Sequence, residues 1–210
     1  MIAINSMMVC LDLSDIDEKL VAFTRYICER LQVDKVYFVH NIKTSELSED
    51  FREWFGDVDL ATEIEGNMAD IVTEHFGNAA THEILVSEEP NTEVILADLV
   101  KRYKIKLTLL GKKMSDKSTG ALGTKLLRIL SCSILVLPET AEFHIERVLV
   151  PIDFSDTSVY ALRLSKNLAE QLGLQLEIMH VYRLPSQFFP LISEEKAVRK
   201  AEEVVKGKFA

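Results

Sequence analysis

The chain has 210 residues with a formal net charge of -9 at pH 7, and 48% of its residues are hydrophobic. This large apolar fraction predicts a packed core and excludes a disordered chain. The negative charge argues against a nucleic-acid partner. No apolar run approaches the ~20 residues that a membrane-spanning helix needs, so we expect no membrane partner.

Residues 1–140 alternate between short apolar runs and helical patterns. Strands are predicted at residues 7–11, 36–39, 83–86, 107–110 and 134–137. Four helices are predicted: one at residues 16–31, one that ends at about residue 76, one that begins at residue 92 and one that begins at Gly123. A mobile loop is predicted at residues 45–57. Short apolar strands separated by helices are typical of parallel sheets with both faces covered. The pattern therefore predicts an α/β fold in which helices sandwich a five-stranded parallel sheet.

The chain then repeats its own opening. Residues 7–15 recur as residues 148–156, and His40 corresponds to His180. The repeat predicts strands at residues 147–152 and 176–181, helices at residues 158–172 and 193–206, and a duplicated domain. We expect one domain at residues 1–140 and the N-terminal half of a second, partial copy at residues 145–210. Because two strands make a poor sheet alone, this copy is either truncated, as we favour, or completed by another chain.

Polar residues and a glycine follow the predicted strands at the edge where such sheets bind ligands. In the first copy these are Asp12, His40 with Asn41, and Gly111. An aspartate in such a turn can also serve only to satisfy backbone N–H groups. Likewise, a histidine at a strand end is more often a packed, hydrogen-bonded side chain than a catalyst.

Several of these segments resemble the universal stress protein family. Residues 148–156, followed by a helix and Met179-His180-Val181, are similar to the opening of such a domain, and residues 9–12 and 39–41 match it more loosely. The family's closing segment is matched by residues 110–111, 123–124 and 132–138. The resemblance implies a Rossmann-like fold of the adenine-nucleotide alpha-hydrolase type in a tandem arrangement. It also implies a cytoplasmic stress-response protein.

The resemblance also implies a nucleotide site. In nucleotide-binding members, closely spaced glycines and a helix N-terminus receive the phosphates, and an aspartate after the first strand contacts the adenosine side. The implied cofactor is ATP. The implied binding residues are Asp12, Gly111, Gly123 and Thr124 in the first copy, and Asp153 and Val181 in the second.

The first copy departs from the family's pattern. Met114 replaces the second glycine, the interval from Gly111 to Gly123 is one residue short, and Asn41 stands where a small apolar residue is usual. Lys112 and Lys113 could compensate with positive charge. The alternative is that both glycines only shape a turn and a helix start. In that case the chain would be a dimerisation or interaction module with a degenerate site.

No arrangement of catalytic residues is visible, so we predict that the chain is not an enzyme. No nucleophile, base and acid combine into a triad, and His75 and His82 join no metal-binding cluster. Cys10, Cys28 and Cys132 are predicted to be reduced thiols, which fits the cytoplasm. By resemblance, a homodimer is expected to form through the fifth strand, Ile134 to Leu137.

Overall fold

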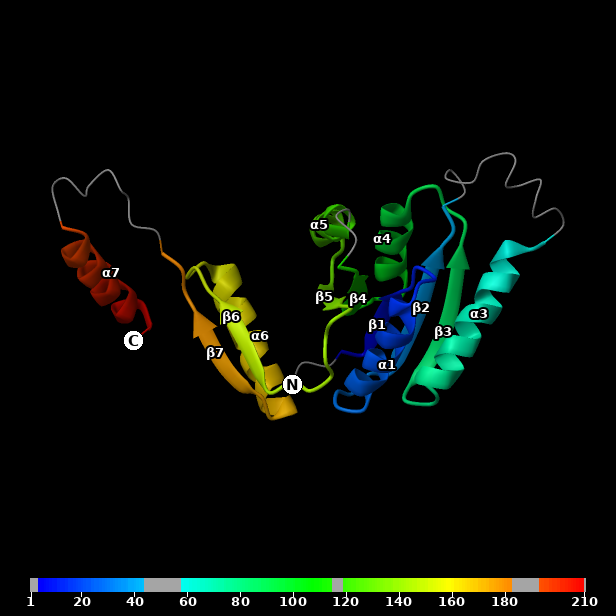
Figure 1. Ribbon diagram of the computed structural model, residues 1–210, viewed down its shortest axis with the longest axis horizontal. Helices are drawn as coiled ribbons and strands as arrows, with labels where there is room; N and C mark the ends of the chain where they lie inside the picture. The colour runs from blue at the N-terminus through cyan, green and yellow to red at the C-terminus, as the bar shows by residue number, and fades with distance from the viewer. Residues whose placement is uncertain (1–3, 44–57, 115–118, 183–192, 210) are drawn as a thin grey trace. The chain divides into compact units, whose positions relative to one another are not determined.

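The computed structural model describes residues 4–43, 58–114, 119–182 and 193–209 (Figure 1). The predicted loop at residues 45–57 lies outside these ranges. The chain divides into two compact units, one at Ala3–His144 and the other built on Ile145–Ala210.

The first unit is built on a single parallel sheet. Its elements are β1 (Ser6–Cys10), α1 (Ile16–Cys28), β2 (Lys35–Asn41), α3 (Leu60–His75), β3 (Thr81–Ser87), α4 (Thr92–Arg102), β4 (Leu107–Lys112), α5 (Thr119–Ile129) and β5 (Ser133–Pro138). The strand order is β3-β2-β1-β4-β5, and every neighbouring pair is parallel. The predicted five-stranded α/β fold is confirmed.

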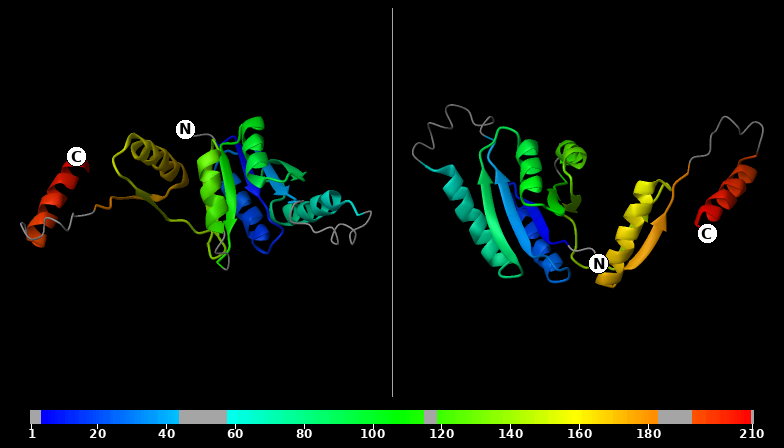
Figure 2. Two further views of the ribbon diagram at one scale, coloured as in Figure 1. Left: turned by 90° about the horizontal axis from the view of Figure 1, so that it is seen from above. Right: turned by 180° about the vertical axis from the view of Figure 1, so that it is seen from behind.

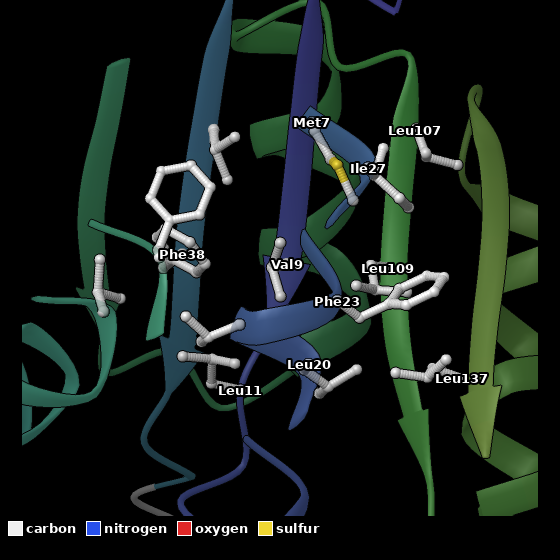
Figure 3. Packing of buried hydrophobic residues seen from close by; sticks show 14 of the residues in the cluster. Met7, Val9, Leu11, Leu20, Phe23, Ile27, Phe38, Leu107, Leu109 and Leu137 are labelled. Atoms are coloured by element: carbon white, nitrogen blue, oxygen red, sulfur yellow. The ribbon is translucent and has the colours of Figure 1, made fainter. Parts of the chain in front are cut away.

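The two faces of this sheet carry separate cores because successive side chains of a strand point to opposite faces. Met7, Val9 and Leu11 belong to the core beneath α1 and α3, which Figure 3 shows at close range. Met8 belongs to the opposite core, beneath α4 and α5. The helices therefore lie on both sides of the sheet (Figure 2).

The second unit repeats a strand, a helix and a strand. β6 (Arg147–Pro151) and β7 (Gln175–Met179) form a parallel two-stranded sheet, joined by α6 (Asp156–Leu172). The Ser155 hydroxyl caps α6 by accepting from the N–H of Ser158, and Gly173 ends the helix with a left-handed φ of 67°, a common helix ending. A further helix, α7 (Glu194–Phe209), follows.

One predicted helix boundary is wrong in a way that affects the site. Gly123 and Thr124 do not open α5, which begins at Thr119, so both residues lie in its second turn. An isolated glycine weakens a helix by only about 1 kcal/mol relative to alanine, so Gly123 does not stop it. Elsewhere α1 ends at Cys28, three residues before the predicted Leu31. None of the helices in the described ranges is long and apolar enough to cross a lipid bilayer.

Candidate functional site

The candidate site lies where the strand order reverses. From β1 the chain places β2 and β3 on one side and then β4 and β5 on the other. The carboxyl ends of β1 and β4 therefore flank the position at which open α/β sheets bind ligands. Cys10 pairs with Leu110 in this ladder, so Asp12 and Gly111 follow at the same edge. We call residues 11–17 the first tip and the corresponding residues 152–158 the second tip.

The Asp12 carboxylate already has partners within the chain. It accepts a hydrogen bond from the Ser14 hydroxyl, and Lys113 Nζ lies 2.9 Å from Asp12 Oδ2. Burial acts to raise the pKa of Asp12, but hydrogen bonds from Ser14 and Lys113 outweigh it and hold the pKa below its usual value. Asp12 is therefore ionised at neutral pH. Lys113, considered above as a compensating phosphate ligand, is paired with this carboxylate instead.

Asp17, in the first turn of α1, fixes the backbone of the first tip. It accepts hydrogen bonds from the N–H of Asp12 at 3.2 Å and of Leu13 at 2.8 Å. Leu13 has a left-handed φ of 61°, which a bulky residue rarely adopts. Our sequence analysis missed Asp17. The available signal was a charged residue on the face of α1 that also carries Leu20 and Phe23.

The second tip repeats this turn with different chemistry. Phe154 has a φ of 64° where Leu13 has 61°. The Asp153 carboxylate accepts from the Ser155 N–H at 2.9 Å and hydroxyl at 2.6 Å. These hydrogen bonds lower the pKa of Asp153 to about 2. Asp153 is thus an exposed, ionised carboxylate.

A histidine ties each tip to the next strand. His40 Nδ1 lies 2.9 Å from the Leu11 carbonyl oxygen, and His180 Nδ1 lies 2.7 Å from that of Ile152. Each carbonyl belongs to the residue directly before the site aspartate. The interpretation of both histidines as hydrogen-bonded structural residues therefore agrees with the geometry.

Asn41 is bound to the loop that follows β3. Its amide nitrogen donates to the Glu89 carbonyl and the Thr92 hydroxyl, both at 2.9 Å. Its amide oxygen accepts from the Ser87 hydroxyl at 2.7 Å and the Glu89 N–H at 3.0 Å. In the second unit the corresponding residue is Val181, which is 78% exposed. The two units thus present different surfaces beside their aspartates.

The three candidate residues that should receive phosphates are placed unequally. A Cβ on Gly111 would lie 3.1 Å from Leu20 Cδ1 and 3.2 Å from Ile16, so the glycine allows α1 to approach β4. Gly123 and Thr124 lie within α5, past the first turn whose N–H groups are free to meet an anion. The structure therefore brings Asp12 and Gly111 to one edge but places neither Gly123 nor Thr124 at the helix start. Residues 115–118, before α5, lie outside the described ranges.

Within the described ranges, no three histidine, cysteine or acidic residues are grouped to hold a metal ion. The thiols in those ranges are free. Burial raises the pKa of Cys10 and of Cys28 to about 12, which makes both thiols unreactive at neutral pH because the thiolate is the nucleophile.

Comparison with known families identifies the second unit. Residues 144–208 match the model of the universal stress protein family. This segment belongs to the universal stress protein family. A comparison with curated proteins finds no match.

Solved structures extend the likeness to the whole chain. A universal stress protein from Archaeoglobus fulgidus DSM 4304 matches with a TM-score of 0.66 and 19% identity, over 98% of this chain and 74% of that chain. At this identity the match shows that the chain has the universal stress protein fold.

Two other structures match less closely. One is a universal stress protein from Archaeoglobus fulgidus in complex with dAMP, with a TM-score of 0.45 and 14% identity, over 62% of this chain and 95% of that chain. The other is the universal stress protein UspA from Lactobacillus plantarum, with a TM-score of 0.48 and 15% identity, over 65% of this chain and 99% of that chain.

Proposed function

We propose that this chain is a stress-response protein that binds an adenine nucleotide such as ATP at its strand tips, without turning it over. The proposal rests on one observation, which is that the two units have strand tips of the same local geometry. In both units an ionised aspartate follows the first strand and precedes a residue with a left-handed φ. An ionised carboxylate accepts hydrogen bonds strongly, and the two hydroxyls of a ribose are matching donors.

The second tip is the better nucleoside site of the two. Among the residues that the structure describes, the Asp153 carboxylate accepts hydrogen bonds from its own turn, whereas the Asp12 carboxylate is also paired with Lys113. Val181 offers an exposed apolar surface next to the second tip, suited to the flat face of an adenine. At the first tip the corresponding Asn41 is bonded to the chain. We therefore assign Asp153 and Val181 as the main ligand residues of the second unit.

Calorimetric titration of the chain with ATP and with adenosine tests this assignment. Losing a hydrogen bond to a charged group costs about 1.5–3 kcal/mol, so Asp153→Ala should weaken binding about 10- to 100-fold. Asp12→Ala is the matched control and should have a much smaller effect. Equal affinity of the wild type and Asp153→Ala would refute the assignment.

We also propose that residues 145–210 are the N-terminal half of a second domain of the same kind. The support is that β6, α6 and β7 repeat the arrangement of β1, α1 and β2, with the same parallel strand pairing. They also repeat the histidine bridge, by which we mean the hydrogen bond between a histidine ring and the carbonyl before the aspartate. We place the protein in the cytoplasm, because free thiols suit a reducing compartment.

A second candidate function is an interaction module that forms a homodimer without a nucleotide. It is favoured by the roles of Gly111 in helix packing and Asn41 in loop binding. Strand β5 lies at the edge of the sheet, with its residue Val136 exposed, so pairing through Ile134 to Leu137 would cover it. Light scattering at micromolar concentration should give a dimer mass for the wild type and a monomer mass for Val136→Lys. A monomeric wild type would exclude this pairing.

A further inference from the structure

The first tip depends on a buried charge that the second tip lacks. Asp17 is only 1% exposed, although its side chain is a carboxylate. Its oxygens accept from two consecutive backbone N–H groups, those of Asp12 and Leu13. Burying a carboxylate is costly unless it is hydrogen-bonded, and the backbone hydrogen bonds from Asp12 and Leu13, with a further contribution from Ser14, offset part of this cost.

The turn held by Asp17 needs external support. Leu13 adopts its φ of 61° with its side chain exposed, so little packing holds it there. A branched side chain in the left-handed region is strained, and such strain persists only where neighbouring groups impose it. The hydrogen bond from the Leu13 N–H to Asp17 is the shorter of the two, at 2.8 Å, and it acts directly on the strained residue.

The second tip supplies a natural comparison. Phe154 has almost the same φ as Leu13, but the residue corresponding to Asp17 is Ser158. The N–H of Asp153 donates to the Ser158 hydroxyl at 3.4 Å. A hydroxyl does not ionise in the physiological pH range. The same turn is therefore held by a titratable group in one unit and by a neutral group in the other.

We propose that Asp17 is a positioning residue that makes the first tip, but not the second, responsive to acid. When the Asp17 carboxylate takes up a proton, one of its oxygens becomes a hydroxyl and a donor. Only the other oxygen then remains a good acceptor for the two N–H groups. Asp12 and Leu13 lose part of their anchor, and the tip that carries Asp12 becomes more mobile.

The surroundings of Asp17 place this change in a useful pH range. Burial raises the pKa of Asp17 to about 6, and the negative charge of Asp12 adds to this effect, while the N–H donors oppose it. Of the other titratable groups, Cys10 on β1 interacts with Asp17 itself, while His40 on β2 and Lys113 after β4 interact with its neighbour Asp12. Of these, His40 is the one whose protonation must be separated experimentally from that of Asp17.

Nuclear magnetic resonance of the whole chain without ligand tests the inference. The 1H–15N heteronuclear NOE of Asp12 and Leu13 should fall between pH 7.5 and 5, with a midpoint near pH 6. The chemical shift of the Asp17 side-chain carboxyl carbon should change with about the same midpoint. The NOE of Asp153 and Phe154 should stay constant. Asp17→Ser, which copies the second tip, should abolish the change, and His40→Gln should leave it in place.

Two further variants keep the test decisive. Asp17→Asn carries a permanently neutral group of the same size and should show the mobile tip already at pH 7.5, even if Asp17→Ser fails to fold. Ser158→Asp should create a pH response in the second tip. Persistence of the response in Asp17→Ser, or its loss in His40→Gln alone, overturns the proposal.

The link to ligand binding rests on the proposed function and is measured separately. If ATP binds the first tip, its affinity there should decrease as the NOE of Leu13 falls. A tip that responds to pH in a chain that binds no nucleotide would refute the proposed function and leave this inference standing. Nucleotide binding with a rigid first tip at every pH would do the reverse.

Discussion

The two strand–helix–strand segments have the same local geometry in different surroundings. In the first, the N–H of Leu11 donates to the Val39 carbonyl at 2.9 Å, and in the second, Ile152 donates to Met179 at 2.8 Å. Both carry the left-handed residue and the histidine bridge. The second segment has these features without a strand like β4 or helices like α4 and α5 among its described residues. The tip is therefore encoded by the strand–helix–strand segment itself.

The burial of equivalent side chains, in contrast, differs between the two segments. Met8 of β1 is 0% exposed because α4 and α5 cover its face of the sheet, whereas the corresponding Leu149 of β6 is 54% exposed. The same position in the same local fold is thus core in one unit and surface in the other. A local segment determines the shape of a candidate site, while the remaining elements determine how much stability each of its residues contributes.

The largest expected effect comes from truncating these two equivalent side chains. Met8→Ala should destabilise the first unit by about 2–5 kcal/mol, because it leaves a cavity in a packed core. Leu149→Ala should change the second unit by about 0.5 kcal/mol or less, as for other exposed positions. Urea unfolding followed separately through the amide signals of β1 and β6 measures both values. A large loss in Leu149→Ala would mean that this face is covered in solution.

The second prediction concerns pH and the buried carboxylate. The pKa of Asp17 is raised from 3.8 to about 6 on folding, so the folded protein holds this proton more tightly than the unfolded chain. Its stabilising contribution is full below pH 3.8 and is lost as the pH rises through 6. A shift of this size corresponds to about 3 kcal/mol at most. Asp17→Ser should therefore flatten the dependence of the first unit's unfolding free energy on pH between 4 and 7.

The second tip gives the control for that experiment because its shift has the opposite sign. The pKa of Asp153 is lowered to about 2 by the Ser155 hydrogen bonds. Its contribution is present above pH 3.8 and is lost only as the pH falls towards 2. Asp153→Asn should therefore leave the pH dependence of the unfolding free energy unchanged between pH 4 and 7. A wild-type first unit whose unfolding free energy is constant over that range would contradict the raised pKa of Asp17.

The sequence was sufficient to predict the sheet but not the contacts of the site. Apolar runs such as residues 107–110 predicted the strands because fully buried parallel strands are continuously apolar. The repeat of residues 7–15 pointed to Asp12 and Asp153. The partners of Asn41 could not be predicted, since Glu89 and Thr92 approach it only when β3 pairs with β2. Nor could the place of Gly123, because local glycine signals do not show where a helix begins.

The smallest expected effect tests the ion pair that distinguishes the two aspartates. Lys113 and Asp12 are partly exposed, and exposed pairs contribute about 0–1 kcal/mol, so Lys113→Met should barely change the unfolding free energy. The pKa of Asp12 should nevertheless rise, because a hydrogen bond and a positive charge that lower it are removed. The pKa of Asp153 should not move. Side-chain carboxyl chemical shifts followed from pH 2 to 6 measure both groups in one sample, and an unchanged Asp12 would mean that the pair does not persist in solution.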